Sequence, residues 1–329
     1  MCGRHSAVAG PANREGEVNP AKVDLVGVGL NATDTLLRLS EFPTSSSKVE
    51  VNSVAVLPGG QVASAVIACQ KWGLSTRYVG KLGDDLAAEV HQREFTEAGA
   101  ETQLVTVQNC ASAQSFILID PRGERTVLWG RAEALTLEPG DVKREWIVNA
   151  RALLVDGCDT AAAIAAARWA REAGVPVIAD FDKAYPGIEE LMTCVDYLIV
   201  SHDFPEQACG EKELSKSLPL LQRRFRCSLT AATLGIDGVL AWDGMRFHHA
   251  RAYQVKTVDT TGAGDIFHAG FIYGLLRDWP IQRRLDFACA AAALNCAATG
   301  ARGGIRPVGE IEKFMVSAAR YDRPESVTF

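Results

Sequence analysis

The sequence predicts an α/β protein with a mostly parallel sheet that is covered by helices on both faces. Strand-like apolar runs alternate with longer helix-like runs along most of the 329 residues, which is the pattern of parallel sheets. The clearest unit is ARALLVDG, an alanine-rich run, and then VPVIADFD, which together read as strand, helix and strand. Two other stretches alternate polar and apolar residues with no helix nearby, and they indicate a second, smaller sheet.

In the first half of the chain, glycines mark where the elements begin and end. Residues 23–29, VDLVGVG, are mostly apolar and read as a buried strand. Residues 61–72 lie between a glycine pair and Gly73, which is typical of a helix, and TRYVGKLG follows as a strand. The next expected helix covers residues 84–98 and ends at Gly99.

The second half begins with the strand, helix and strand unit, in which the expected helix covers residues 160–173. LTAATLG and VLAWDG then read as two strands that a glycine-bounded turn separates. By the same reasoning, the later elements are a strand at 196–201, strands at 229–235 and 239–244, and helices at 266–277, 281–298 and 311–321.

The second sheet is expected from residues 45–58 and 112–129. Residues 45–58 alternate in polarity, and residues 112–129 form two strand-like runs around the turn Asp-Pro-Arg-Gly. A flap over a cleft and an ordinary surface hairpin both remain open on composition alone. Residues 1–21, which contain no apolar core of a secretory signal, are expected to be a disordered leader to a domain at 22–329.

The overall charge disfavours a nucleic-acid partner. The chain has 34 Lys and Arg against 40 Asp and Glu, a formal net charge of -6, whereas a nucleic-acid surface is basic. Nine cysteines, with no CxxC pair, indicate reduced thiols and a cytoplasmic location. No apolar run is long enough to predict a membrane span.

A glycine motif near the N-terminus invites a dinucleotide-binding interpretation. GVGLNA, residues 27–32, follows a strand and fits GxGxxA. However, a dinucleotide turn opens directly into a helix, and here a short segment follows that ends at a proline. A strand-end loop that presents Asn31 or Asp34 to a ligand is favoured, because ligands of open α/β sheets bind beyond the carboxyl ends of the strands.

The stretch DTTGAGDIFHAGF, residues 259–271, carries the chemistry of the sequence. It reads as a glycine loop that feeds a helix, and the first N–H groups of a helix have no internal partner and attract negative charge. Gly262, Ala263 and Gly264 could therefore bind a phosphoryl group, and Asp265 lies beside them as a base for a hydroxyl. An acidic helix cap explains the same residues equally well.

The stretch also resembles the C-terminal signature of the ribokinase, or phosphofructokinase B (PfkB), family of carbohydrate kinases. The resemblance extends from about Val23 to the C-terminal helix. In order, it includes Asp34 at a strand end, the diglycine 59–60, VGKLGDD, TLGIDG and GARGGIRP. It implies a ribokinase-like, doubly wound sheet with a small β-sheet lid, and an ATP-dependent kinase that phosphorylates a sugar hydroxyl.

The resemblance also implies roles for individual residues. Asp265 matches the catalytic base of the family and residues 262–264 its anion hole. The positions expected to bind the sugar are Asn31, Asp34, Gly59, Gly60, Gln61 and Ser64. The positions expected to bind the nucleotide are Thr233, Gly235, Gly238, Asn295 and Gly300.

Two departures from the family pattern concern the substrate and the metal. The asparagine that often follows the diglycine is replaced, so Gln61 or Ser64 is expected in its place. The NxxE motif, which organises Mg²⁺ through water, appears as SHDFPE, so Asp203 or Glu206 is the expected substitute. Some members bind potassium near the anion hole, and whether a monovalent cation binds here stays open.

The expected function is therefore ATP-dependent phosphorylation of a small ribose-like or ketose-like sugar, with Mg²⁺ as a cofactor and a homodimer through the lid as an open possibility. A nucleoside kinase of the same fold is one alternative. Alternatives of other classes are an NAD-dependent dehydrogenase built on GVGLNA and a sugar-binding regulator without catalysis. Nucleic acid and membrane are not expected partners.

Overall fold

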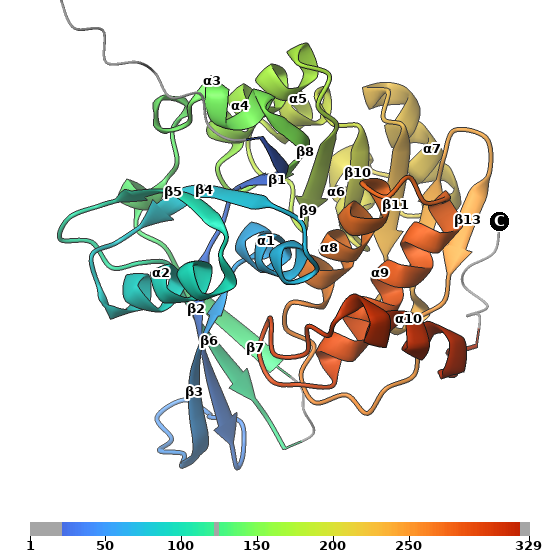
Figure 1. Ribbon diagram of the computed structural model, residues 1–329. Helices are drawn as coiled ribbons and strands as arrows, with labels where there is room; N and C mark the ends of the chain where they lie inside the picture. Colours follow the sequence, from blue (N-terminus) through green and yellow to red (C-terminus); the bar gives the residue numbers. More distant parts are fainter. Residues whose placement is uncertain (1–21, 122–124, 323–329) are drawn as a thin grey trace, which may run out of the picture.

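A computed structural model describes residues 22–121 and 125–322. The predicted leader, residues 1–21, lies outside the described residues. Within them the fold has a large mostly parallel sheet between two layers of helices, and a smaller sheet that projects from one end (Figure 1). The predicted fold class is confirmed.

The main sheet has nine strands among the described residues. Their order across the sheet is β13 (Phe247–Ala250), β12 (Val239–Trp242), β11 (Leu229–Thr233), β10 (Tyr197–Ser201), β9 (Val177–Phe181), β8 (Ala150–Asp156), β1 (Val23–Val28), β4 (Thr76–Leu82) and β5 (Glu101–Thr106). Pairing is parallel from β11 to β5, and only β12 and β13 are antiparallel. The carboxyl ends of seven strands therefore meet at one edge, where ligands of such sheets bind.

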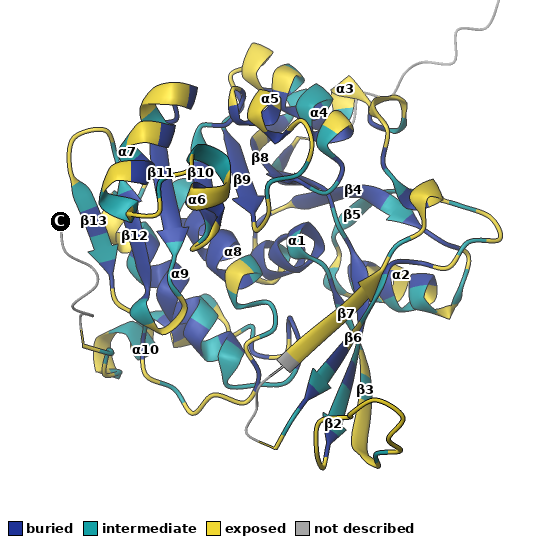
Figure 2. Ribbon diagram, turned by 180° about the vertical axis from the view of Figure 1, so that it is seen from behind, coloured by how far each residue is buried: buried dark blue, intermediate teal, exposed yellow. Residues whose placement is uncertain are grey.

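Two separate apolar cores hold the helices against the two faces of this sheet. One face carries α1 (Gln61–Lys71), α2 (Leu86–Ala98), α8 (Ala263–Leu275), α9 (Ile281–Cys296) and α10 (Val308–Ser317). The other face carries α3 (Arg144–Val148), α4 (Thr160–Glu172), α5 (Ile188–Met192), α6 (Phe204–Cys209) and α7 (Leu214–Phe225). Figure 2 shows the strands between these layers as almost wholly buried. Because these strands are buried on both faces, their sequences are almost continuously apolar.

The small sheet has the order β3 (Val51–Gly59), β2 (Ala32–Leu39), β6 (Gln114–Ile119) and β7 (Arg125–Gly130). Both alternating stretches of the sequence contribute strands to it, as expected. The segment after GVGLNA, which the sequence analysis left unassigned, is the strand β2. The dehydrogenase alternative needs a helix at this point, and the strand does not provide one.

Two other details differ from expectation. Helix α8 begins at Ala263, so Asp265 lies in its first turn rather than before it, and α10 covers Val308–Ser317 rather than 311–321. The short 3₁₀ turns are η1 (Glu133–Leu135), η2 (Pro139–Asp141) and η3 (Gly235–Asp237). No helix of the described residues combines the length and the apolar character that crossing a membrane requires.

Candidate active site

The loop that leads into α8 is shaped by Gly262. Its φ is 74°, a left-handed conformation that glycine adopts without strain. A Cβ atom at this position would lie 2.3 Å from the carbonyl oxygen of Ala301. Only glycine therefore lets the loop pass this close to the following segment. The α8 N-terminus has no side-chain cap among the described residues. The Ala263 N–H donates to the Thr260 carbonyl at 3.3 Å, so the neighbouring amide groups of Gly262 and Gly264 are the ones that can bind a ligand.

Asp265 lies in the first turn of α8 and lines the larger of two cavities. Burial and the nearby Asp180 raise the pKa of Asp265 to about 7, while His268 and Arg302 act in the opposite direction. A carboxyl group with this pKa is a stronger base near neutral pH than an ordinary aspartate, because its ionised form holds a proton more tightly.

The larger cavity has a volume of about 650 Å³ and lies between the carboxyl edge of the main sheet and one face of the small sheet. On the main-sheet side, Asp180 lies near the end of β9, Asp182 follows this strand, and Ser201 ends β10. On the small-sheet side, its wall includes Asp34, Ser115, Ile117, Val127 and Trp129. The wall combines carboxylate and hydroxyl groups with apolar side chains, which suits a polyhydroxylated ligand under a cover.

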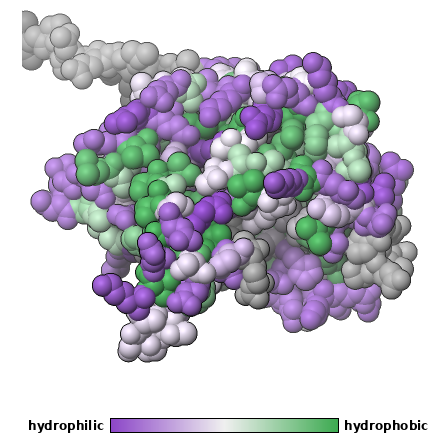
Figure 3. All heavy atoms as spheres, turned by 90° about the horizontal axis from the view of Figure 1, so that it is seen from below, coloured by the Kyte–Doolittle hydropathy of each residue, from purple (hydrophilic) through white to green (hydrophobic). Residues whose placement is uncertain are grey.

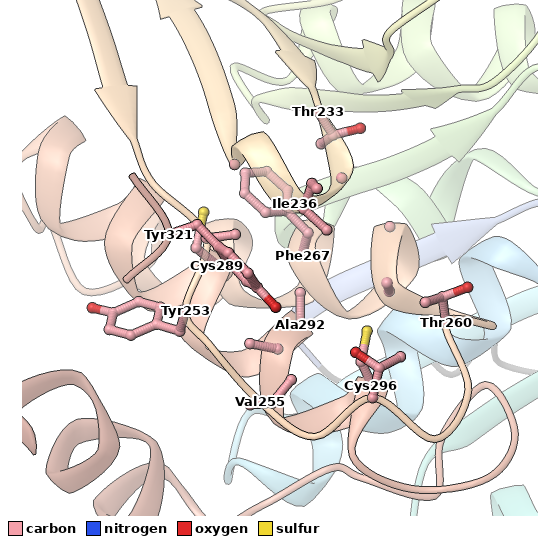
Figure 4. Close-up of a pocket in the computed structure, with 17 residues that line it drawn as sticks. Thr233, Ile236, Tyr253, Val255, Thr260, Phe267, Cys289, Ala292, Cys296 and Tyr321 are labelled. Carbon is pink, nitrogen blue, oxygen red and sulfur yellow. The ribbon is translucent and has the colours of Figure 1, made fainter. Parts of the chain in front are cut away.

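The smaller cavity has a volume of about 220 Å³ and is mainly apolar. It lies between the η3 turn, α8 and α9 (Figure 4), and Ile236 of η3 and Phe267 of α8 contribute to its wall. Ala292 and Cys296 of α9 line the other side. A flat aromatic base fits a narrow apolar slot of this kind.

The two cavities meet at the start of α8. Thr233, Thr260, Ala263 and Gly264 line both of them. A ligand in the smaller cavity can therefore extend toward Asp265, and a ligand in the larger cavity can approach the same point from the other side. This arrangement is what transfer of a group between two bound molecules needs.

Of the residues predicted to bind the sugar, Asp34, Gly60 and Gln61 line the larger cavity. Asn31, Gly59 and Ser64 do not appear in its wall. The Asn31 amide turns toward the main sheet, where its Nδ2 donates to Tyr78 Oη at 2.6 Å and to the Lys81 carbonyl at 3.0 Å.

Gly59 and Ser64 are held instead by Arg302, which the sequence analysis did not single out. The Arg302 guanidinium donates to the Ser64 hydroxyl at 3.1 Å and to the Gly59 carbonyl at 2.6 Å, and it pairs with Glu94 of α2. Arg302 thereby fastens the GARGGI loop to the start of α1, just behind the cavity.

Of the residues predicted to bind the nucleotide, Thr233, Gly235 and Gly238 line the smaller cavity, whereas Asn295 and Gly300 line neither. Asn295 is fully buried, and its Nδ2 donates to the carbonyls of Thr261 and Ala301. It therefore supports the glycine loop from behind.

The comparison with known protein families identifies the family to which a chain with this site belongs. Residues 24–307 match the family described as pfkB family carbohydrate kinase. The chain belongs to this family. The predicted reaction class, phosphoryl transfer to an alcohol group, is thereby confirmed.

Relatives of this pfkB kinase act on different sugars. It is 30% identical over 277 residues to an ATP-dependent ribose-1-phosphate kinase of Halopiger xanaduensis, and the alignment covers 82% of this chain and 90% of the relative. It is 25% identical over 323 residues to a 5-dehydro-2-deoxygluconokinase of Geobacillus kaustophilus, with 89% and 93% covered. A ribokinase of Arabidopsis thaliana solved with ribose and ATP has a TM-score of 0.79 at 22% identity, covering 89% and 99%, and shows the shared fold.

The residues predicted to organise Mg²⁺ are not part of either cavity wall of this kinase. Asp203 and Glu206 lie at the start of α6 and line neither cavity, and the Asp203 carboxylate pairs with His202 at 2.8 Å. Among residues 22–121 and 125–322, no group of three His, Cys, Asp or Glu side chains could hold a metal ion.

The most informative residues that the sequence analysis missed are Asp180 and Asp182. Asp180 lies near the carboxyl end of β9 and Asp182 directly follows the strand. The rule that ligands bind beyond the carboxyl ends of parallel strands therefore applied to VPVIADFD as it did to Asp34. The burial of Asp180 raises its pKa well above the usual range, with a further contribution from Asp182. His248 in β13 is buried, and its Nε2 lies 2.7 Å from Asp243 Oδ2, away from both cavities.

Proposed function

We propose that this pfkB kinase transfers the γ-phosphoryl group of ATP to a hydroxyl of a small sugar, with Asp265 as the base. The observation that carries the proposal is the meeting of two cavities at the uncapped start of α8, next to a carboxyl group whose pKa is raised to about 7. The smaller cavity takes the adenine and ribose of ATP, and the larger cavity takes the sugar.

In the proposed reaction, the Asp265 carboxylate accepts the proton of the sugar hydroxyl. The hydroxyl oxygen forms a bond to the γ-phosphorus as the bond from this phosphorus to the β,γ-bridging oxygen breaks, and ADP leaves with the electron pair. The amide groups of residues 262–264 stabilise the negative charge on the transferring group. Asp34, Gly60 and Gln61 orient the sugar so that one hydroxyl faces Asp265.

In this proposal the small sheet acts as a lid. The proposal keeps the boundaries that the sequence predicts for the kinase domain and for its lid segments. Asp34, Ile117 and Trp129 contribute to one wall of the larger cavity, so the sheet lies over the sugar and can exclude water from the phosphoryl group. Water would otherwise compete with the sugar as acceptor. Mg²⁺ enters the proposal only as a counter-ion that neutralises the phosphate chain of ATP.

The proposal includes a cytoplasmic location and a homodimer through the lid. The location is supported by the described cysteines, all of which are free thiols. The homodimer is supported by the outer patch, which we define as Val54, Val56, Phe116 and Leu128 on the lid face that points away from the cavity. These side chains are 43–61% exposed, and apolar surface of this kind favours association.

An ADP-release assay with ATP and a panel of acceptors tests the function. Ribose and fructose represent neutral sugars, ribose-1-phosphate and 5-dehydro-2-deoxygluconate represent the charged substrates of the relatives, and adenosine represents the nucleoside kinase alternative. We expect ADP release above the acceptor-free rate with at least one sugar. Thermal stabilisation by a sugar without ADP release from any acceptor would contradict the proposal and support the non-catalytic alternative.

A further inference from the structure

The chain directly after α10 closes one side of the smaller cavity. We call residues 318–321 the C-terminal strap. It makes a short antiparallel bridge with the segment after β13. In this bridge the Gln254 N–H donates to the Ala319 carbonyl at 2.9 Å, and the Tyr321 N–H donates to the Ala252 carbonyl at 3.0 Å. Ala252 and Tyr321 both line the smaller cavity, so the strap brings a residue from the end of the fold into its wall.

Arg320 fixes the strap from the side that faces away from the cavity. Its guanidinium pairs with Asp286 of α9 and donates to Tyr253 Oη. The same group lies 4.2 Å from the centre of the Tyr253 ring, which is a cation–π contact. Successive side chains of an extended segment point to opposite sides. With Arg320 turned to this cluster, its neighbour Tyr321 is turned toward the cavity.

The two tyrosines of the cavity wall differ in what their hydroxyl groups contact. The Tyr253 hydroxyl is occupied by Arg320, and in Figure 4 it points away from the other labelled side chains. The Tyr321 hydroxyl has no hydrogen-bond partner in the part of the chain that the structure describes, and in Figure 4 it points toward Ala292 of α9. A phenol both donates and accepts, so Tyr321 offers a ligand a polar group that the protein itself does not use.

Tyr321 lies at the end of the cavity that is remote from the proposed transfer of the phosphoryl group. The residues shared with the larger cavity mark the other end, at the start of α8, and Tyr321 is not among them. Around Tyr321 the wall is apolar and includes Ala292 and Cys289 of α9. A flat base suits these surroundings better than a ribose or a phosphate, because its faces are apolar and its edge is polar.

We propose that Tyr321 binds the base of ATP, with its ring in the wall of the slot and its hydroxyl hydrogen-bonded to the edge of the base. The proposal rests on the proposed function, in which the smaller cavity takes the nucleotide. An adenine edge carries a ring nitrogen that accepts and an amino group that donates, and a phenol can pair with either. The C-terminal strap thereby contributes to recognition of the phosphoryl donor.

The test measures the Kd of ATP with Mg²⁺ and no acceptor, by isothermal titration calorimetry. Tyr321→Phe keeps the ring and removes the hydroxyl, so the Kd should rise about three- to tenfold. Tyr321→Ala also removes the ring from the wall, and the Kd should rise about thirtyfold or more. With the acceptor found in the ADP-release assay, the KM for ATP should rise in the same order, while kcat at saturating ATP stays within about twofold.

Tyr197→Phe is the matched control. Tyr197 of β10 is half-buried like Tyr321, and its hydroxyl also lacks a partner among residues 22–121 and 125–322, but it lines neither cavity. Its loss should leave the Kd of ATP within about twofold of the unaltered chain. An unchanged Kd in Tyr321→Phe, or an equal rise in both variants, overturns the proposal.

A second nucleotide separates the base from the ribose. The compound 2′,3′-dideoxy-ATP has the base of ATP but lacks both ribose hydroxyls. If Tyr321 binds the base, the substitution Tyr321→Phe raises the Kd of both nucleotides by the same factor. If the rise is confined to ATP, the Tyr321 hydroxyl contacts the ribose and the assignment to the base is wrong.

The outcomes distinguish this inference from the proposed function. ATP binding that weakens in Tyr321→Phe, without ADP release from any acceptor, contradicts the proposed function alone. Turnover with an unaltered KM for ATP in Tyr321→Phe contradicts the inference alone. An unaltered chain that does not bind ATP contradicts both. If Tyr321→Ala fails to fold, the comparison of Tyr321→Phe with Tyr197→Phe still decides, because each differs from the unaltered chain by one oxygen atom.

Discussion

At the scale of single residues, the proposed base Asp265 has a cost in stability. An aspartate that is ionised in the unfolded chain above pH 3.8 must hold its charge in a site that raises its pKa to about 7. Ionisation therefore favours the unfolded state, because the folded state binds the proton more tightly. The cost is absent below about pH 4, grows as the pH rises, and is complete above about pH 7.

Asp265→Asn is expected to remove this cost together with catalysis. We expect turnover to fall by at least about a thousandfold and the free energy of unfolding at pH 8 to rise by an amount on the order of 1–4 kcal/mol. The rise should shrink toward pH 4, where the carboxyl group is protonated in both states. Chemical denaturation at several pH values, with the ADP assay beside it, measures both effects, and retained turnover would exclude Asp265 as the base.

Asp34 is buried in the wall of the larger cavity at 5% exposure. Asp34→Asn keeps the shape of the side chain but weakens its hydrogen bonds to sugar hydroxyls, so the KM for the sugar should rise about tenfold. The KM for ATP should change by less than about twofold, because Asp34 does not line the smaller cavity. Steady-state kinetics with each substrate varied separates the two, and equal increases would show that Asp34 is structural.

At the scale of elements, the start of α8 depends on how closely its loop approaches the segment around Ala301. Gly262→Ala would add a Cβ atom 2.3 Å from the Ala301 carbonyl oxygen at a φ of 74°. The loop must then move away from Ala301, and kcat should fall about tenfold or more because the amide groups of the anion hole move with it.

Gly174→Ala is the matched control for this prediction. Gly174 also has a positive φ, 71°, but no atom lies within 4 Å of the added Cβ atom, and the residue is remote from both cavities. It should lose about 1–2 kcal/mol of stability through backbone strain and keep its kcat. Equal losses of kcat in the two variants would show that conformational strain alone, rather than the contact with Ala301, decides the result.

The sequence allowed most elements to be predicted because their apolar runs are long and bounded by glycines. The strand β2 was missed because TLLRLSEF has neither a clean alternation nor a bounding glycine, and residues on both of its faces are buried. The position of Asp265 at a cavity could be predicted from the glycine loop before it, and its role as the base stays a proposal. The roles of Asn31, Asn295 and Arg302 could not be predicted, because they depend on the direction in which each side chain points. Residue type does not reveal which neighbour an amide or a guanidinium contacts.

At the scale of the whole molecule, the small sheet has two apolar faces with different neighbours. Asp34 and Ile117 belong to the face that lines the larger cavity, and the outer patch belongs to the opposite face. Figure 3, which views the end of the molecule where this sheet projects, shows hydrophobic atoms among hydrophilic ones. The cavity accounts for the apolar side chains of the inner face, and the proposed homodimer accounts for those of the outer patch.

Val54→Glu combined with Val56→Glu tests the homodimer. These neighbours on β3 are 61% and 54% exposed, and two carboxylates on a contact related by symmetry would oppose one another. Analytical ultracentrifugation should show a dimer for the unaltered chain and a monomer for the double variant. Val316→Glu, at a position 90% exposed on α10, should remain dimeric, and a monomeric unaltered chain would contradict the proposal.

The junction of the two cavities at Thr233, Thr260, Ala263 and Gly264 also has a pharmacological consequence. A compound that joins adenosine to a sugar through a short polyphosphate chain could occupy both compartments at once. Its second half would bind at the high local concentration that the tether imposes, so the affinity should exceed that of either fragment by orders of magnitude. The tether length that binds best would measure how far phosphorus travels between donor and acceptor.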